Sequence, residues 1–229
     1  NSNSHLFANL GGKIDSISKY SVQYQSVTND KYLKIHNLST SSPLINNESV
    51  LTSKINYSKN IDSNTKFRTD FIAYEDLSKR NNDRFQYILP NFTFSKNLEL
   101  DQNYNGNFKF KSSGFQKNYD TNKYESLLIN DFLFESNDYV NNKGLVTNYD
   151  LLIKNFNSYT ENSSLYKEKE DYEVFGTLLI NTSLPLKKIT NTGNDYLKPI
   201  TSFRYSPNNT KNISNKNKRL SYNNIFALN

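Results

Sequence analysis

Apolar and polar side chains alternate along short segments that recur through most of the chain. The clearest case is the segment from Asp195 to Asn208, where apolar side chains share one parity and polar and cationic side chains take the other. Because a strand points alternate side chains to opposite faces, this segment predicts a strand with one apolar and one polar face. Pro199 marks a strand start, a bulge or an edge, and Pro207 opens a polar turn.

The same alternation predicts roughly eleven or twelve strands in all, nearly all joined by polar links, and no convincing helix. Besides Asp195 to Asn208, the predicted strands cover residues 1–12 (a strand end), 19–27, 32–38, 50–58, 65–75, 85–95, 108–112, 122–136, 145–153, 173–186 and 220–228. This order predicts an all-β, antiparallel, up-and-down meander.

Three local signals refine the strand pairing. The segments 50–58 and 65–75, linked by 60–64, form the best hairpin in the sequence. The apolar parity switches at Pro90 and Asn91, as a β-bulge would produce, and a bulge there returns the aromatic side chains to one face. The pair Asn105-Gly106 is a strong hairpin-turn signal.

The links between strands differ in length. Residues 60–64 and 141–144 are short links, 187–195 is a polar link, and residues 76–84 and 155–171 are long, charged links. Outer-membrane barrels keep short turns on the periplasmic side and long loops outside, and their strands are about ten residues long and half apolar. The pattern therefore favours an outer-membrane barrel over a soluble sandwich.

Composition fits many thin strands better than a thick aliphatic core. Mean hydropathy is −0.79, which is low for a compact soluble domain, yet the chain has 17 Tyr and 15 Phe, which disordered chains usually lack. No run approaches the ~18 apolar residues of a transmembrane helix, and the first residues lack a signal-peptide core. Barrel strands escape such hydropathy windows.

Charge and missing residue types narrow the function. The net charge is +6 with a pI of about 9.2, but the cations are scattered, and the one cluster, Lys211 to Arg219, is interpreted as a solvated loop. We therefore expect no nucleic-acid partner. The chain has no Cys, which excludes a disulfide framework and thiol chemistry. It has no Met, so we expect a fragment or a processed chain.

No residue pattern points to catalysis. His5 and His36 have no second ligand at metal spacing, and the acidic residues Glu168, Glu170 and Asp171 are interpreted as a solvated loop, with divalent-cation binding as the alternative. The sequence lacks nucleophile-elbow, phosphate-loop, zinc-protease and dinucleotide motifs. We expect no enzymatic activity, no cofactor and no metal site.

Basic residues opposite the aromatic parity are the candidate functional residues. If the aromatic side chains face lipid, these cations face the lumen of the barrel. There they either solvate a polar interior or meet the phosphates of an amphipathic cargo. The candidates are Lys54, Lys66, Arg68, Lys109, Lys111, Lys198 and Arg204.

Strand and turn signatures in one order resemble a known family. The run YKEKEDYEVFGTLLINTSLPL, DYLKPITSFRYSPN and LSYNNIFALN resembles the late barrel of the lipopolysaccharide-assembly outer-membrane protein family LptD, in its alphaproteobacterial form. The upstream segments FQYILPNFTFSKNL, GNFKFKSSG, YDTNKYESLLINDF and DKYLKIHNL resemble the same family in the same order. The resemblance covers most of the chain and is most specific from Arg84 to Leu228.

The resemblance implies a large outer-membrane barrel that exports lipopolysaccharide without an enzymatic step. An LptE-like lipoprotein plugs such a barrel, and LptA-like periplasmic bridge proteins deliver the lipid. We expect residues 1–229 to be a fragment of the C-terminal barrel domain, without the periplasmic jelly-roll and the closing strands, and therefore an open curved sheet. The alternatives are another outer-membrane barrel, such as a porin or a TonB-dependent receptor, or a secreted β-rich adhesin.

Overall fold

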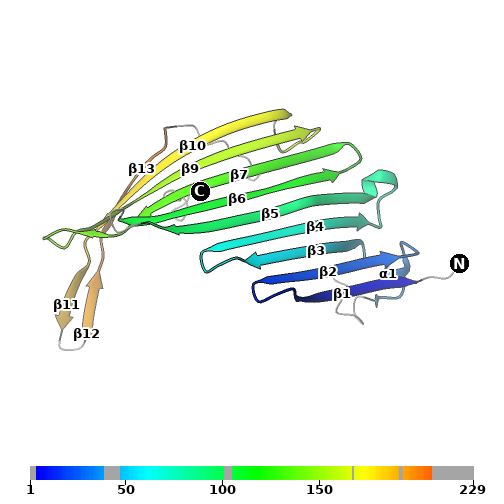
Figure 1. The fold of residues 1–229 in the computed structure, drawn as a ribbon, viewed down its shortest axis with the longest axis horizontal. Helices are drawn as coiled ribbons and strands as arrows, with labels where there is room; N and C mark the ends of the chain where they lie inside the picture. The colour runs from blue at the N-terminus through cyan, green and yellow to red at the C-terminus, as the bar shows by residue number, and fades with distance from the viewer. Residues whose placement is uncertain (1–3, 39–46, 101–104, 167, 191–192, 208–229) are drawn as a thin grey trace. The chain divides into compact units, whose positions relative to one another are not determined.

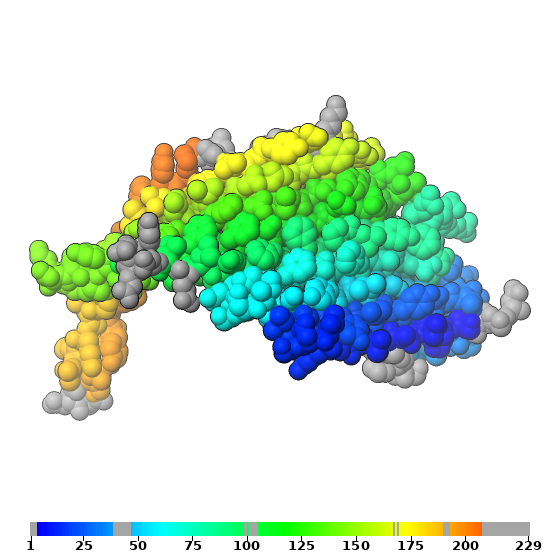
Figure 2. Space-filling model, viewed as in Figure 1, coloured from blue at the N-terminus to red at the C-terminus, as the bar shows by residue number. Residues whose placement is uncertain are grey.

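The computed structural model describes residues 4–38, 47–100, 105–166, 168–190 and 193–207. Within them the chain forms an open, antiparallel, eleven-stranded sheet whose neighbouring strands follow nearly in chain order (Figures 1 and 2). The spatial order is β1 (His5–Lys13), β2 (Ser18–Val27), β3 (Val50–Asn60), β4 (Thr65–Asp76), β5 (Phe85–Glu99), β6 (Gly106–Tyr119), β7 (Lys123–Ser136), β9 (Val146–Glu161), β10 (Lys169–Ser183) and β13 (Ile200–Tyr205). The prediction of an all-β antiparallel meander is confirmed.

The remaining elements are short. Strand β8 (Tyr139–Val140) pairs with β9, and β11 (Leu186–Thr190) pairs with β12 (Gly193–Leu197) in a separate two-stranded sheet. The helical elements are α1 (Tyr32–Ile35) and the 3₁₀ helix η2 (Asn81–Arg84). No helix among the described residues has the length and apolarity needed to span a membrane.

The chain divides into two compact units, and the long strands β5, β6, β7, β9 and β10 contribute to both. Unit 1 comprises residues 1–96, 112–129 and 156–172, and unit 2 comprises residues 97–111, 130–155 and 173–229.

The predicted hairpin and bulge are both confirmed. Strands β3 and β4 pair along their full lengths, with Ile55 opposite Phe71. The ladder between β4 and β5 shifts register next to Pro90, where two residues of β5 stand opposite Phe71 alone. Because of this bulge, the aromatic residues on both sides of Pro90 face the same side of the sheet.

One predicted strand is a helix in the structure. Residues 32–38 were expected to form a strand, but they form α1 and a following turn. The helix separates two apolar side chains that a strand would place on one face: Leu33 is fully buried, whereas Ile35 is 69% exposed. Leu33 forms a small core with Leu51 and Leu77, against which Phe7, Val27, Tyr32 and Leu38 pack.

The long loop expected at residues 155–171 is also wrong. Strand β9 continues to Glu161 and β10 begins at Lys169, so the link is only 162–168. Alternation continues through this part of β9, but Ser158 and Thr160 occupy two of its buried positions beside Phe156, so the apolar signal is weak.

The C-terminal pattern is divided more finely than predicted. Residues 187–195, expected to be a link, lie mostly in the hairpin β11–β12, and the expected strand from Asp195 to Asn208 is split between β12 and β13. Pro199 lies at the split, since it has no N–H for a ladder, and its carbonyl accepts a hydrogen bond from the Leu184 N–H (3.1 Å). The predicted strand 220–228 and the basic loop Lys211 to Arg219 lie outside the described residues.

Link lengths follow the predicted alternation only in part. At one end of the meander the links are 28–49, 77–84, 120–122 and 162–168, and at the other they are 14–17, 61–64, 100–105, 137–145 and 184–199. The short link 120–122 therefore lies at the end where long links were expected. The hairpin β11–β12, within 184–199, lies at the end where short links were expected. Gly106 is the first residue of β6 rather than the centre of a two-residue turn.

Candidate functional site

The two faces of the sheet differ in an unusual way. In unit 1, Leu10, Val22, Ile55 and Phe71 stand directly opposite one another in a row across β1, β2, β3 and β4. In unit 2, Ile180 pairs with Phe203 and Leu178 with Tyr205. Several of these side chains are largely exposed, among them Leu10 (61%), Ile55 (51%) and Phe203 (58%). We call this surface the apolar face.

The apolar face carries exposed large side chains on most of the sheet strands that the structure describes. The exposed residues at its positions include Tyr24, Tyr87, Leu89, Phe132, Tyr149, Leu151, Ile153, Val174 and Tyr205. Rings also meet across strands, as Phe110 does with Phe132 and Phe134 with Tyr149. An exposed apolar surface of this extent indicates contact with lipid or with another apolar surface.

The opposite surface, which we call the polar face, is less exposed and carries polar and charged groups. In unit 1, Asp70 on this face is nearly buried and is surrounded by Lys54 (3.1 Å), Arg68 (3.6 Å) and the Asn56 amide, which donates to its carboxylate. Apolar side chains such as Ile72 are buried beside it. Two cations therefore share one carboxylate, which leaves the cluster with a net positive charge.

The polar face of unit 2 is also built from ion pairs and amides. Lys109 pairs with Glu135, and Lys154 pairs with Asp131 (3.4 Å). The Asn181 amide donates to Asn148 (3.2 Å), and the Ser202 hydroxyl donates to Asn181 (2.7 Å), so a polar row crosses β9, β10 and β13.

Six of the seven candidate cations lie where the parity placed them. Lys54, Lys66 and Arg68 are on the polar face of unit 1, and Lys109, Lys111 and Arg204 occupy the polar-face positions of β6 and β13. Within the described residues, Lys66, Lys111 and Arg204 form no ion pair. Lys198 lies between β12 and β13, outside the ladder, so strand parity does not assign it to a face.

A buried carboxylate on the polar face escaped the sequence analysis. Glu125 of β7 is 1% exposed and accepts hydrogen bonds from the Tyr119 hydroxyl (2.6 Å) and the Ser163 hydroxyl (2.7 Å). Ser163 in turn accepts from the backbone N–H of Leu165 (3.1 Å), and the Asn162 amide donates to the Asn122 carbonyl (2.8 Å). The link 162–168 is therefore tied to β7 and the neighbouring turn.

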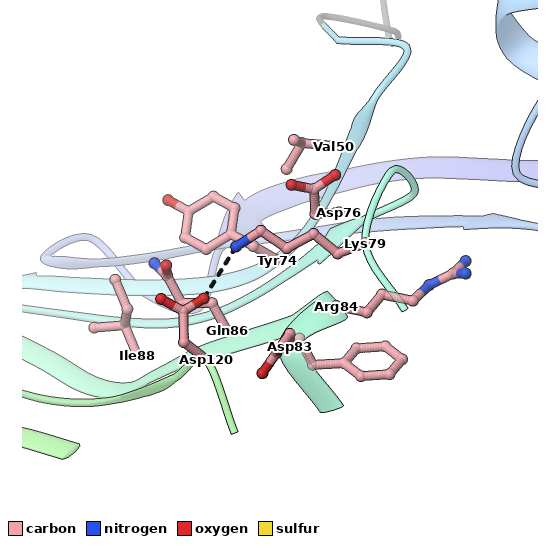
Figure 3. A pocket seen from close by; sticks show the side chains of 10 residues that line it. Val50, Tyr74, Asp76, Lys79, Asp83, Arg84, Gln86, Ile88 and Asp120 are labelled. Carbon is pink, nitrogen blue, oxygen red and sulfur yellow. Dashed lines mark hydrogen bonds and ion pairs between the residues drawn. The ribbon is translucent and has the colours of Figure 1, made fainter. Parts of the chain in front are cut away.

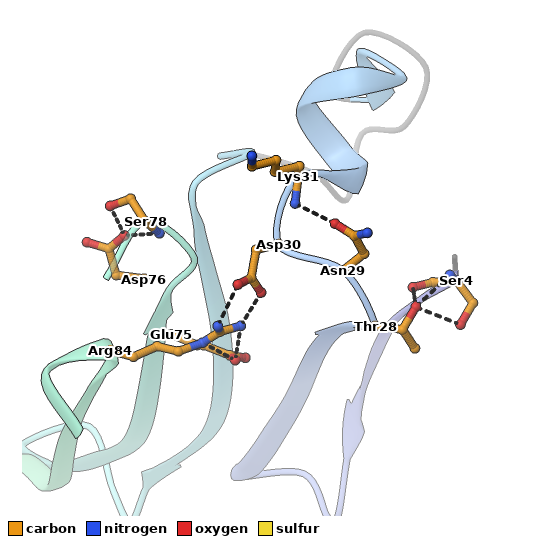
Figure 4. A network of polar contacts seen from close by, with 9 residues as sticks. All are labelled: Ser4, Thr28, Asn29, Asp30, Lys31, Glu75, Asp76, Ser78 and Arg84. Carbon is orange, nitrogen blue, oxygen red and sulfur yellow. Dashed lines mark hydrogen bonds and ion pairs between the residues drawn. The ribbon is translucent and has the colours of Figure 1, made fainter. Parts of the chain in front are cut away.

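A second polar network joins the longer links of unit 1. Arg84 of η2 donates to both oxygens of Asp30 (2.9 and 2.7 Å) and to Glu75 (2.7 Å), so it connects the β2–β3 link to the end of β4 (Figure 4). The hydrogen bonds that Arg84 donates to Asp30 and Glu75 raise the pKa of its guanidinium above the ordinary value. Sequence spacing gave no signal for this network, because Asp30 and Arg84 are distant in the chain.

The next links are joined through Asp120. Lys79 donates to Asp120 (3.0 Å), and Lys123 contacts the other carboxylate oxygen (3.2 Å). Lys79 and Asp120 border a cavity of about 290 Å³ that is also lined by Tyr74, Gln86 and Ile88 (Figure 3). Thr121 donates to Asp83 beside it.

The Lys79–Asp120 pair predicts a pH dependence. Hydrogen bonds from Lys79 and Lys123 lower the pKa of Asp120, and Asp120 raises the pKa of Lys79. The contribution of the Asp120 carboxylate to folding stability is present above about pH 4, and it is lost as pH falls through the lowered pKa. The lysine contribution is lost only as pH rises through a pKa above about 10.4. Because both side chains are partly exposed, we expect the pair to contribute about 0.5 kcal/mol at most to the free energy of unfolding.

Urea unfolding of the purified chain in detergent at neutral and acid pH measures this effect. Lys79→Gln should lower the free energy of unfolding slightly at neutral pH. It should therefore reduce the difference in that free energy between neutral and acid pH. Lys143→Gln is the charge-matched control, since Lys143 forms no ion pair in the described part of the chain. An equal response of both variants would contradict the assignment.

Other sequence candidates have structural partners. The rings of His5 and His36 both contact the Tyr32 ring at tilted angles, an arrangement that the sequence did not reveal. The ring centroids of His5 and Tyr32 are 5.6 Å apart, and those of His36 and Tyr32 are 4.9 Å apart. Among the described residues, no group of three or more His, Cys, Asp or Glu side chains could hold a metal ion.

No protein-family model matches the chain, and the search of curated proteins finds no match.

Proposed function

We propose that this chain forms part of the wall of an outer-membrane β-barrel that moves lipopolysaccharide to the cell surface, as in the LptD family. The exposed apolar face opposite a less exposed, charged face carries the proposal. A soluble sheet buries its apolar face, whereas a barrel in a membrane exposes that face to lipid and keeps polar groups inside. Among the described residues, the antiparallel meander runs from β1 to β13, which is the strand order of such a wall.

Cations on the polar face support the lipopolysaccharide part of the proposal. Lys54, Arg68 and Lys109 contact carboxylates, so these three chiefly balance the interior charge. Lys66, Lys111 and Arg204 have no ion pair in the described residues and remain the best phosphate contacts. In this proposal an LptE-like lipoprotein fills the lumen, LptA-like proteins deliver the lipid, and no step is enzymatic.

Site-specific photo-crosslinking in cells that carry the protein in their outer membrane tests the proposal. Probes at Lys111 and Arg204 sample the polar face, and probes at Phe110 and Phe203 sample the apolar face. We expect crosslinks to lipopolysaccharide at the polar-face positions, and we expect them to disappear when the cell's energy supply is blocked. Crosslinks from the apolar face report surrounding lipid and should persist.

The outcomes separate the alternatives. A folded membrane protein with no polar-face crosslinks would favour a porin or a receptor barrel. Recovery of the protein outside the membrane would favour a secreted adhesin. Charge reversal at Lys111 and Arg204 should weaken the polar-face crosslinks, and charge reversal at Lys143 in a link should leave them unchanged.

A further inference from the structure

A second cavity lies among the links of unit 1, beside the Arg84 network. Its volume is about 460 Å³, and α1, the residues before α1, and the β4–β5 link surround it. The lining includes Asp30, Lys31, Lys34, Leu77, Lys79 and Arg80. Cavities of this size accommodate a small ligand.

The charge of this cavity is strongly positive. Four cations line it against one carboxylate, Asp30, and that carboxylate already accepts two hydrogen bonds from Arg84 (Figure 4). Lys79 pairs with Asp120, and Lys34 lies within electrostatic reach of Asp76. Within the described residues, Lys31 and Arg80 form no ion pair. These two cationic side chains remain available to an anion, and Lys34, which also forms no ion pair among the described residues, adds a third.

We propose that this cavity binds a phosphomonoester group through Lys31, Lys34 and Arg80. A guanidinium matches two phosphate oxygens at once, and the two ammonium groups add point charges around the third. The volume exceeds that of a phosphate alone, so the group would be attached to a sugar or a lipid headgroup. Ile35, which is 69% exposed, gives such a ligand an apolar contact at the rim.

This site is independent of lipopolysaccharide transport, because it lies in the links rather than along the polar face. The cavity would bind a phosphomonoester in any barrel that contained these links. Failure of the crosslinking experiment above would leave the site intact, and failure of the experiment below would leave the transport proposal intact.

Lysine footprinting of the purified chain in detergent micelles tests the site. An amine-acylating reagent modifies exposed lysines, and mass spectrometry measures the rate at each position. We expect glucose phosphate, or phosphatidic acid added to the micelles, to slow modification of Lys31 and Lys34 severalfold. Lys143 and Lys188, which are distant from these links in the chain, are internal references and should not change. Glucose and phosphatidylcholine are the neutral controls.

The variants make the result specific. Arg80→Gln should reduce the protection of Lys31 and Lys34, whereas Lys143→Gln should not. Protection by glucose phosphate identifies a soluble phosphate ligand, and protection by phosphatidic acid alone identifies a lipid headgroup. The proposal would be overturned if neither probe protected Lys31 and Lys34. It would also be overturned if Lys188 were protected equally, or if Arg80→Gln left the protection unchanged.

Discussion

Replacing Gly114 by alanine is expected to destabilise the sheet by about 1–3 kcal/mol, the usual cost of overpacking a well-packed position. Gly114 lies inside β6, and a Cβ added there would lie 2.5 Å from the backbone carbonyl oxygen of Leu127. It would also lie 3.0 Å from the Phe92 ring. A carbonyl of the neighbouring strand cannot move aside as a flexible side chain can, so the ladder between β6 and β7 must shift.

Gly176 of β10 provides the matched control, because a Cβ added there meets no atom within 4 Å. Gly176→Ala should leave stability unchanged or raise it slightly, since alanine restricts the unfolded chain. The measurement is the urea midpoint of the purified chain in detergent, followed by far-ultraviolet circular dichroism. Equal midpoints for Gly114→Ala and Gly176→Ala would show that β6 and β7 are not packed as described.

Removing the Glu125 carboxylate should have a comparable effect. Glu125→Ala leaves the partly buried hydroxyls of Tyr119 and Ser163 without their acceptor, and an unsatisfied buried group costs about 1–3 kcal/mol, so we expect the lower part of that range. The link 162–168 should also loosen, because Ser163 connects it to Glu125. Glu125→Gln keeps an acceptor oxygen and should cost less.

Glu161 supplies the comparison for this prediction. It accepts a hydrogen bond from Tyr159, as Glu125 does from Tyr119, but its side chain lies in an exposed position. Glu161→Ala should therefore change stability little. The expected result is a lower urea midpoint and faster proteolysis within 162–168 for Glu125→Ala only. Identical behaviour of the two alanine variants would mean that Glu125 is not buried by this link.

Local sequence patterns predicted most of the strands, the bulge and the separation of the two faces. Period-two alternation is a local property, so it placed Lys66, Lys109 and Arg204 opposite the aromatic residues without knowledge of any partner. The switch of parity at Pro90 was equally local, and the register shift between β4 and β5 followed from it.

Tertiary structure alone decided which groups meet. The burial of Leu33 against Leu51 and Leu77 makes residues 32–35 a helix, although their local pattern fits a strand. Asp70 gathers Lys54 and Arg68, Glu125 is covered by the link 162–168, and Arg84 joins Asp30 to Glu75. Each contact depends on the register of separate strands or on the path of a link, and alternation carries no information about either. The sequence therefore assigned cations to a face of the sheet. The fold decided which of these cations are neutralised by carboxylates and which remain available to a ligand.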